Sequence, residues 1–115
     1  MDKKSFGAWA ENLASRYLAK LGYKIIDRNW HCRFGELDII AKKDGLIHFV
    51  EVKARRNQIF GWPEEAVTIS KQQKLVAAIA CYFGSGPETP WQLDLVIIEQ
   101  RGQKYYWQLF ENIGE

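Results

Sequence analysis

The sequence has little of what marks a secreted or membrane protein. Its two cysteines, Cys32 and Cys81, lack the paired spacing of a zinc site and are too few for a disulfide framework. No apolar run approaches the roughly 18–20 residues that cross a bilayer, and no apolar signal segment follows Lys3 and Lys4. These absences favour a cytoplasmic protein.

A strong charge of either sign is also missing. The chain has 16 Lys and Arg against 14 Asp and Glu, a net charge of +2 that permits a polyanionic partner without requiring one. A length of 115 residues and a hydrophobic content of 47% suffice for a core without disulfides or a structural metal. Because no repeat or low-complexity stretch divides the chain, we expect residues 1–115 to form a single domain.

Helical signals occur in two segments. Apolar residues recur at helical spacing over residues 5–21, where Ser5 is the expected N-cap and Gly22 the stop. A second helix is predicted over residues 70–83, opened by the capping box Ser70-x-x-Gln73.

Apolar, β-branched and aromatic runs between turn residues predict the strands. We expect them at residues 23–30, 36–42, 46–53, 91–99 and 104–110. Asp44-Gly45 is a strong hairpin signal between the second and third, whereas residues 54–67 are expected to form a loop. The chain is therefore predicted to be an α/β protein, a mixed sheet flanked by helices in the order αβββαββ.

Three charged residues stand in apolar strand segments. Asp38 lies within Leu37–Ile40, and Glu51 and Lys53 close the apolar run that begins at Ile47. Charges at such positions are costly unless they pair or bind a metal. The spacing therefore indicates that these residues form a candidate site.

The predicted hairpin brings the charges together. A two-residue turn places Asp38 directly across from Glu51, and Glu36 across from Lys53. Side chains alternate along a strand, so these four share one face of the ribbon. The other face is expected to be apolar and to suit a helix; it carries Leu37, Ile39, Ala41, Leu46, Val50 and Val52.

Two opposed carboxylates, at roughly 5 Å between Cβ atoms, repel each other. A divalent cation reverses this effect because it gives hard oxygen ligands a common partner. The alternative is a solvated charged face, in which Asp38 and Glu51 pair with Lys53 and neighbouring arginines. The apolar residues that flank both acids favour the metal site.

The segment Gly35–Ile40, followed by Phe49–Arg55, resembles the catalytic pattern of the PD-(D/E)xK nuclease superfamily, which shares a restriction-endonuclease-like fold. The chain is similar in more detail to the YraN-type bacterial family of predicted endonucleases, distantly related to archaeal Holliday junction resolvases. The similarity extends from Ala10-Glu11 through Arg28–Trp30 to residues 93–96. It implies a restriction-endonuclease-like domain that hydrolyses phosphodiester bonds in DNA, with branched or structured DNA as the substrate.

The resemblance also implies a role for each residue. Asp38 and Glu51 would hold Mg²⁺ or Mn²⁺ together with the backbone carbonyl of Val52. Lys53 would orient or deprotonate the attacking water and stabilise charge in the transition state. Glu11 would match an acidic residue that some superfamily members carry on the first helix. It lies at the rim of the apolar stripe, so an ordinary surface glutamate is the alternative.

More basic and aromatic residues lie near this segment. Four are candidate phosphate contacts, with a solvated charged face as the alternative: Arg55, Arg56, Lys71 and Lys74. Three are candidates for stacking on unpaired bases: Trp30, Phe60 and Trp62. Outside the site, His48 is predicted to be a buried packing residue and Asp94 to be structural.

Two functions fit these features. The first is a Mg²⁺- or Mn²⁺-dependent deoxyribonuclease, whose low net charge a homodimer through the last strands would offset by doubling the basic surface. The second is a non-catalytic nucleic-acid-binding or adaptor domain that retains the nuclease fold. A metal-dependent enzyme acting on another substrate is a third. Metal titration in the presence of branched DNA distinguishes the first two.

Overall fold

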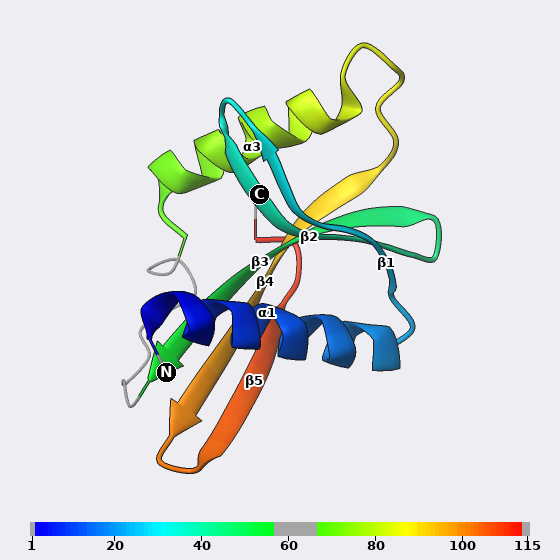
Figure 1. Cartoon of the computed structure of the whole chain (residues 1–115). Coiled ribbons are helices and arrows are strands. Elements are labelled where there is room, and N and C mark those ends of the chain that lie inside the picture. The colour runs from blue at the N-terminus through cyan, green and yellow to red at the C-terminus, as the bar shows by residue number, and fades with distance from the viewer. Residues whose placement is uncertain (1, 57–66, 114–115) are drawn as a thin grey trace.

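The computed structural model of the chain describes residues 2–56 and 67–113. They form two helices and one five-stranded sheet with the spatial order β1-β2-β3-β4-β5 (Figure 1). In chain order the elements are α1 (Lys3–Lys20), β1 (Lys24–Cys32), β2 (Gly35–Lys43), β3 (Leu46–Arg56), α3 (Ile69–Phe83), β4 (Trp91–Arg101) and β5 (Lys104–Phe110). The predicted α/β class with a mixed sheet is confirmed.

The sheet is mixed because β3 and β4 pair in parallel while the other neighbours pair antiparallel. A parallel pair needs a crossover connection, and α3 lies between these two strands in the sequence. The parallel pairing continues to Arg56 and Gln100. Residues 54–56, predicted as loop, therefore extend β3, and the rest of that predicted loop up to residue 66 lies outside the described residues.

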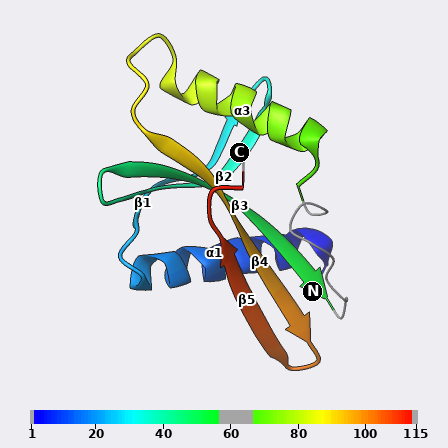
Figure 2. The same cartoon turned by 180° about the vertical axis from the view of Figure 1, so that it is seen from behind.

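The two helices cover opposite faces of the sheet. In Figure 1, α1 lies in front of the strands and α3 behind the β1–β2 hairpin, and Figure 2 shows the reverse view. Ile39 and Val50 are buried in the cluster under α1, as the alternation predicts. Phe49 is buried in the cluster under α3. Leu37 belongs to this second cluster and not to the α1 face predicted for it, because β2 departs from β3 near this residue.

Helix α1 begins earlier than predicted. Asp2 is its N-cap, and Asp2 Oδ1 accepts a hydrogen bond of 2.7 Å from the backbone N–H of Ser5. Ser5, the predicted cap, is therefore inside the first turn. The predicted stop at Gly22 is confirmed, with φ at 93° in the left-handed region that glycine tolerates.

Helix α3 also begins before its predicted cap. Thr68 is the N-cap, and Thr68 Oγ1 accepts a hydrogen bond of 3.2 Å from the N–H of Lys71. Ser70 lies in the helix, so the proposed capping box is wrong. The end is as predicted, at Phe83 with Gly84 following at φ 63°.

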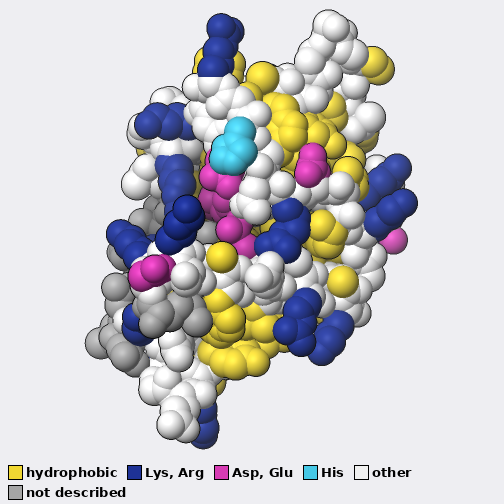
Figure 3. All heavy atoms as spheres, viewed as in Figure 1, with side chains coloured by type: hydrophobic (Ala, Val, Ile, Leu, Met, Phe, Trp, Pro, Cys, Tyr) yellow, Lys and Arg dark blue, Asp and Glu magenta, His cyan; other side chains and the backbone are white. Residues whose placement is uncertain are grey.

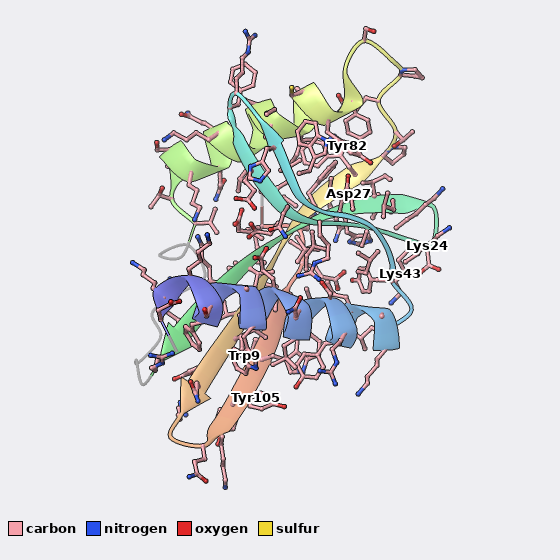
Figure 4. All side chains as sticks on the ribbon, viewed as in Figure 1. Trp9, Lys24, Asp27, Lys43, Tyr82 and Tyr105 are labelled. Carbon is pink, nitrogen blue, oxygen red and sulfur yellow. The ribbon has the colours of Figure 1, made fainter. Side chains whose placement is uncertain are left out.

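The β4–β5 hairpin packs against α1 through aromatic side chains. Trp9 of α1 meets Tyr105 of β5 edge to face, with ring centroids 5.5 Å apart (Figure 4). Tyr17 and Trp107 stack with centroids 4.5 Å apart.

Neither described helix is long and apolar enough to span a membrane.

Candidate functional site

Strands β2 and β3 separate partway along their length. Their paired register runs from the turn as far as Ile39 and Val50, which confirms the predicted alignment over these residues. Beyond this pair, no further β2–β3 pairs form within the described chain. The predicted ladder pairs Asp38–Glu51 and Glu36–Lys53 are therefore wrong, because β2 separates from β3 beyond Ile39 while it stays paired with β1 along its other edge.

The Asp38 side chain lies in the gap where the strands separate. Its Oδ2 accepts a hydrogen bond of 2.9 Å from the backbone N–H of Val52. In an unbroken ladder this N–H would bond to the backbone of Leu37, the next partner in the register. The N–H and C=O of an extended residue point to the same edge of the strand. The Val52 carbonyl therefore also faces the gap.

Glu51 meets Asp38 from the side of α3. The Asp38 carboxylate lies close enough to Glu51 to favour the protonated form of Glu51, which can donate a hydrogen bond to it. Glu51 is only 7% exposed. Its burial, followed by the hydrogen bond to Asp38 and the charge of Asp38, raises the pKa of Glu51 to about 9, while Lys71 acts in the opposite direction. The structure thus brings the two predicted acids together, with one of them protonated at neutral pH when no cation is bound.

Two more carboxylates approach Asp38 from other directions. One oxygen each of Glu11, Glu36 and Asp38 lie within 4.8 Å of one another. Burial, followed by the charges of Asp38 and Glu36, raises the pKa of Glu11 to about 7, and Arg28 partly opposes this. We call these four acids, Glu11, Glu36, Asp38 and Glu51, the acidic cluster. It joins residues of α1, β2 and β3.

Asn29 of β1 connects two members of the acidic cluster. With its amide nitrogen turned toward them, it donates hydrogen bonds of 2.8 Å to Glu11 Oε1 and of 2.8 Å to Glu36 Oε1. Its φ of 53° is in the left-handed region, where asparagine is enriched among residues other than glycine. The sequence analysis missed this residue. The available signal was an asparagine within a predicted strand, where asparagine is depleted.

A pocket of about 260 Å³ opens onto the acidic cluster beside α3. Its lining is Phe34, Gly35, Glu36, Asp38, Glu51, Lys71, Lys74 and Leu75. Lys71 and Lys74, two of the predicted phosphate contacts, thus share this pocket with Asp38 and Glu51. Figure 3 shows acidic side chains gathered between α1 and the β1–β2 hairpin, with Lys and Arg side chains on either side.

Strand alternation separates the other basic candidates. Lys53 and Arg55 lie on the same face of β3 as Glu51, whereas Arg56 lies on the α1 face. The Arg56 guanidinium carbon is 4.3 Å from the centroid of the Phe6 ring. Arg56 therefore packs against α1, on the opposite face from the pocket.

An exposed aromatic residue lines the pocket at the tip of the β1–β2 hairpin. Phe34 is 42% exposed, and the Arg33 guanidinium carbon lies 4.8 Å from its ring centroid. The sequence analysis passed over Phe34 because it stands between predicted strands. Trp30, a predicted base-stacking residue, is half-buried and packs edge to face against an aromatic residue of α3. Phe60 and Trp62 lie outside the described residues.

His48 and Asp94 lie away from the acidic cluster and are buried, as predicted for His48. They are 4% and 0% exposed. His48 Nδ1 and Asp94 Oδ2 form a hydrogen bond of 2.7 Å between β3 and β4. Asp94 Oδ1 also accepts hydrogen bonds from Gln92 Nε2 at 2.8 Å and from the backbone N–H of Asn112 at 2.9 Å.

Comparisons with known proteins give one family. The family model described as Uncharacterised protein family UPF0102 matches residues 10–98, which include Glu11, Asp38, Glu51 and Lys53. A UPF0102 protein of Syntrophomonas wolfei is 52% identical over 84 residues, 73% of this chain and 73% of that relative. A UPF0102 protein of Lachnoclostridium phytofermentans is 44% identical over 117 residues, 99% of each chain.

Proposed function

We propose that this chain, which belongs to the uncharacterised protein family UPF0102, is a metal-dependent endonuclease that hydrolyses phosphodiester bonds in DNA. The observation that carries the proposal is the convergence of acids from α1, β2 and β3 beside a pocket that also holds lysines. The proposal includes a restriction-endonuclease-like domain, the fold implied by the resemblance of the segment around Glu51-Val52-Lys53.

Mg²⁺ or Mn²⁺ is the cofactor that fits the acidic cluster. These cations prefer carboxylate, carbonyl and water oxygens, and the side chains that converge here offer carboxylate oxygens. Burial and the neighbouring Asp38 raise the pKa of Glu51, and a divalent cation between the two carboxylates would let both ionise. Asp38, Glu51 and the Val52 carbonyl would hold the ion, with Glu11 as a further ligand or a water-binding group.

The chemistry of hydrolysis depends on groups of this chain around the cofactor. When bound, the metal supplies Lewis-acid stabilisation of the charge that develops on the phosphate oxygens. Lys53, on the Glu51 face of β3, orients or deprotonates the attacking water and stabilises the same developing charge. Lys71 and Lys74 hold the flanking phosphates from α3.

DNA with an unpaired or branched region suits this pocket. The exposed Phe34 ring offers a stacking surface for a base that has left the duplex, and Arg33 lies over the same ring. A net charge of +2 is low for a monomer that grips long duplex by its phosphates. A homodimer would double the basic surface; Tyr105 and Tyr106 on the edge strand β5, 47% and 49% exposed, are candidates for its interface.

The test is a cleavage screen with the whole chain. Branched, flapped, single-stranded and linear duplex DNA of matched sequence are incubated with Mg²⁺, with Mn²⁺ and with EDTA. We expect metal-dependent nicking of the branched or flapped substrates, lost in Asp38→Asn and Glu51→Gln. DNA binding that is indifferent to metal, with no cleavage of any substrate, would reject the enzyme in favour of a non-catalytic adaptor domain.

A further inference from the structure

We propose that Cys32 and Cys81 are a redox-sensitive pair, which a peroxide oxidises to a reversible disulfide between the β1–β2 hairpin and α3. Both cysteines are free thiols in the structure. Cys32 is half-buried at the end of β1, and Cys81 is exposed near the end of α3. Neither residue belongs to the acidic cluster, so formation of the bond does not depend on any endonuclease activity.

The packing of α3 on the hairpin brings the two cysteines to one place. Cys32 and Trp30 lie on the same face of β1, because side chains alternate along a strand, and both pack against the core cluster under α3. On α3, Tyr82 directly follows Cys81, and its ring meets the Trp30 ring edge to face with centroids 5.4 Å apart. The hairpin lies against α3 in both ribbon views (Figures 1 and 2). The aromatic contact thus places the end of β1 beside the turn of α3 that carries Cys81.

The two thiols are close enough to influence each other. The Cys32 side chain is the main cause that raises the pKa of the Cys81 thiol, ahead of burial, while the charge of Arg33 acts in the opposite direction. The thiolate is the form that reacts with oxidants. A raised pKa therefore keeps the pair slow to react, which suits a response to sustained oxidant and not to a brief exposure.

The turn of the hairpin holds Cys32 in position. Cys32 pairs with Gly35 across the turn, and its Sγ accepts a hydrogen bond of 3.4 Å from the backbone N–H of Phe34. Cys81 is exposed, so its side chain can rotate without displacing residues of the core. Rotation of the Cys81 side chain is therefore the movement that brings the two sulfurs into bonding distance.

The oxidation moves two electrons from the thiols to the peroxide. The thiolate of the exposed Cys81 attacks one peroxide oxygen, the O–O bond breaks, hydroxide leaves, and Cys81 becomes a sulfenic acid. The Cys32 thiolate then attacks the Cys81 sulfur, the S–S bond forms, and a second hydroxide leaves. The two hydroxides take up the two thiol protons, so two thiols and one hydrogen peroxide give one disulfide and two waters. A thiol reductant reverses the bond by exchange.

The disulfide would tie together two walls of the pocket beside the acidic cluster. Phe34 and Gly35 at the tip of the hairpin line one wall, and Lys71 and Lys74 of α3 line another. A covalent link between the hairpin and α3 restricts how far these walls can separate. Where thiols are kept reduced, as in the cytosol, a disulfide of this kind is transient and redox-sensing.

The test treats the whole reduced chain with hydrogen peroxide and then blocks the remaining thiols with N-ethylmaleimide. We expect intact mass spectrometry to show a monomer that has lost two hydrogen atoms and takes up no maleimide, and peptide mapping to find the link between Cys32 and Cys81. Dithiothreitol should restore both thiols. The linked protein should melt roughly 8 °C or more above the reduced protein, and amide hydrogen exchange at residues 33–35 should slow.

Cys32→Ser and Cys81→Ser are the matched controls, because each keeps one thiol and a side chain of similar size at the other position. Each should form a sulfenic acid that dimedone traps, with no intramolecular link and no rise in melting temperature. The proposal is overturned if oxidised wild-type protein carries two separate sulfenic or sulfinic acids, or links only between molecules. It is also overturned if the linked protein melts at or below the temperature of the reduced protein, or if exchange at residues 33–35 is unchanged.

Discussion

Asp38 Oδ2 accepts a hydrogen bond of 2.9 Å from the backbone N–H of Val52, at the point where β2 and β3 stop pairing. The side chain thus replaces a backbone acceptor in the ladder, and the strands separate without leaving that N–H unpaired. The same separation leaves room for Glu11 to approach from α1 and for Glu51 to meet Asp38 from the other face. The separation of β2 from β3 therefore accounts both for the break in the ladder and for the position of the acidic cluster.

The first prediction concerns Asp38→Asn. The asparagine oxygen can still accept from the Val52 N–H, while the charge beside Glu51 is removed. We expect weaker Mn²⁺ binding in calorimetry, but a metal-free melting temperature equal to or above that of the wild type. Asp27→Asn, a change at an exposed carboxylate of β1, is the matched control. A clear fall in the metal-free melting temperature of Asp38→Asn would instead favour a salt-bridged charged face.

The second prediction is a pH dependence of stability without metal. The pKa values of Glu51 and Glu11 are raised to about 9 and about 7, mainly by burial. Between the unfolded-state pKa of about 4.3 and these folded values, the folded chain binds more protons than the unfolded chain. The free energy of unfolding therefore falls as pH rises through this window. Thermal melts in EDTA from pH 5 to pH 9 measure it.

Glu51→Gln isolates the part of this dependence that Glu51 contributes. Glutamine keeps the size of the side chain, can donate to Asp38 and does not ionise. We expect a flatter pH dependence of the melting temperature. If the loss of Glu51 ionisation raises the free energy of unfolding by about 1 kcal/mol near pH 8.5, the melting temperature there should be about 4 °C or more above wild type. Parallel pH curves for variant and wild type would show that Glu51 is not the titrating group.

Local sequence signals predicted much of the framework. The Asp44-Gly45 turn and the alternation of apolar residues set the register of β2 and β3 from the turn as far as Ile39 and Val50. The helix starts were wrong because two residues that can cap a helix lie close together at each start, Asp2 and Ser5 at α1 and Thr68 and Ser70 at α3. The local energy of helix capping alone discriminates poorly between two candidate residues so close together in the sequence.

Features that depend on distant segments escaped the sequence analysis. Arg55 and Arg56 have loop-like polarity, but β4, far along the chain, pairs with them and extends β3. The approach of Glu11 to Asp38 depends on how α1 crosses the sheet, which helical periodicity does not specify. Asn29 takes part in the acidic cluster through a left-handed backbone conformation that its neighbours in sequence do not signal.

The third prediction concerns Lys53→Ala. Lys53 shares a face of β3 with Glu51, and its proposed role is in the transition state and not in holding the metal. We expect cleavage of a branched substrate at saturating Mn²⁺ to fall by about 100-fold or more, with the Mn²⁺ dissociation constant nearly unchanged. Lys42→Ala, at an exposed lysine of β2, is the matched control. Cleavage at the wild-type rate would remove Lys53 from the mechanism.

The last prediction separates the two contributions of Asn29, its amide and its backbone conformation. Asn29→Gly removes the amide that donates to Glu11 and Glu36 but tolerates the φ of 53°. Asn29→Ala removes the amide and also strains the backbone by about 1–2 kcal/mol. We expect both variants to weaken Mn²⁺ binding by roughly 10-fold, as loss of a group that orients metal ligands does, and only Asn29→Ala to lose the larger share of stability. Calorimetric titration and thermal melts measure the two effects. If Asn29→Gly binds Mn²⁺ as the wild type does, the Asn29 amide does not position the acidic cluster.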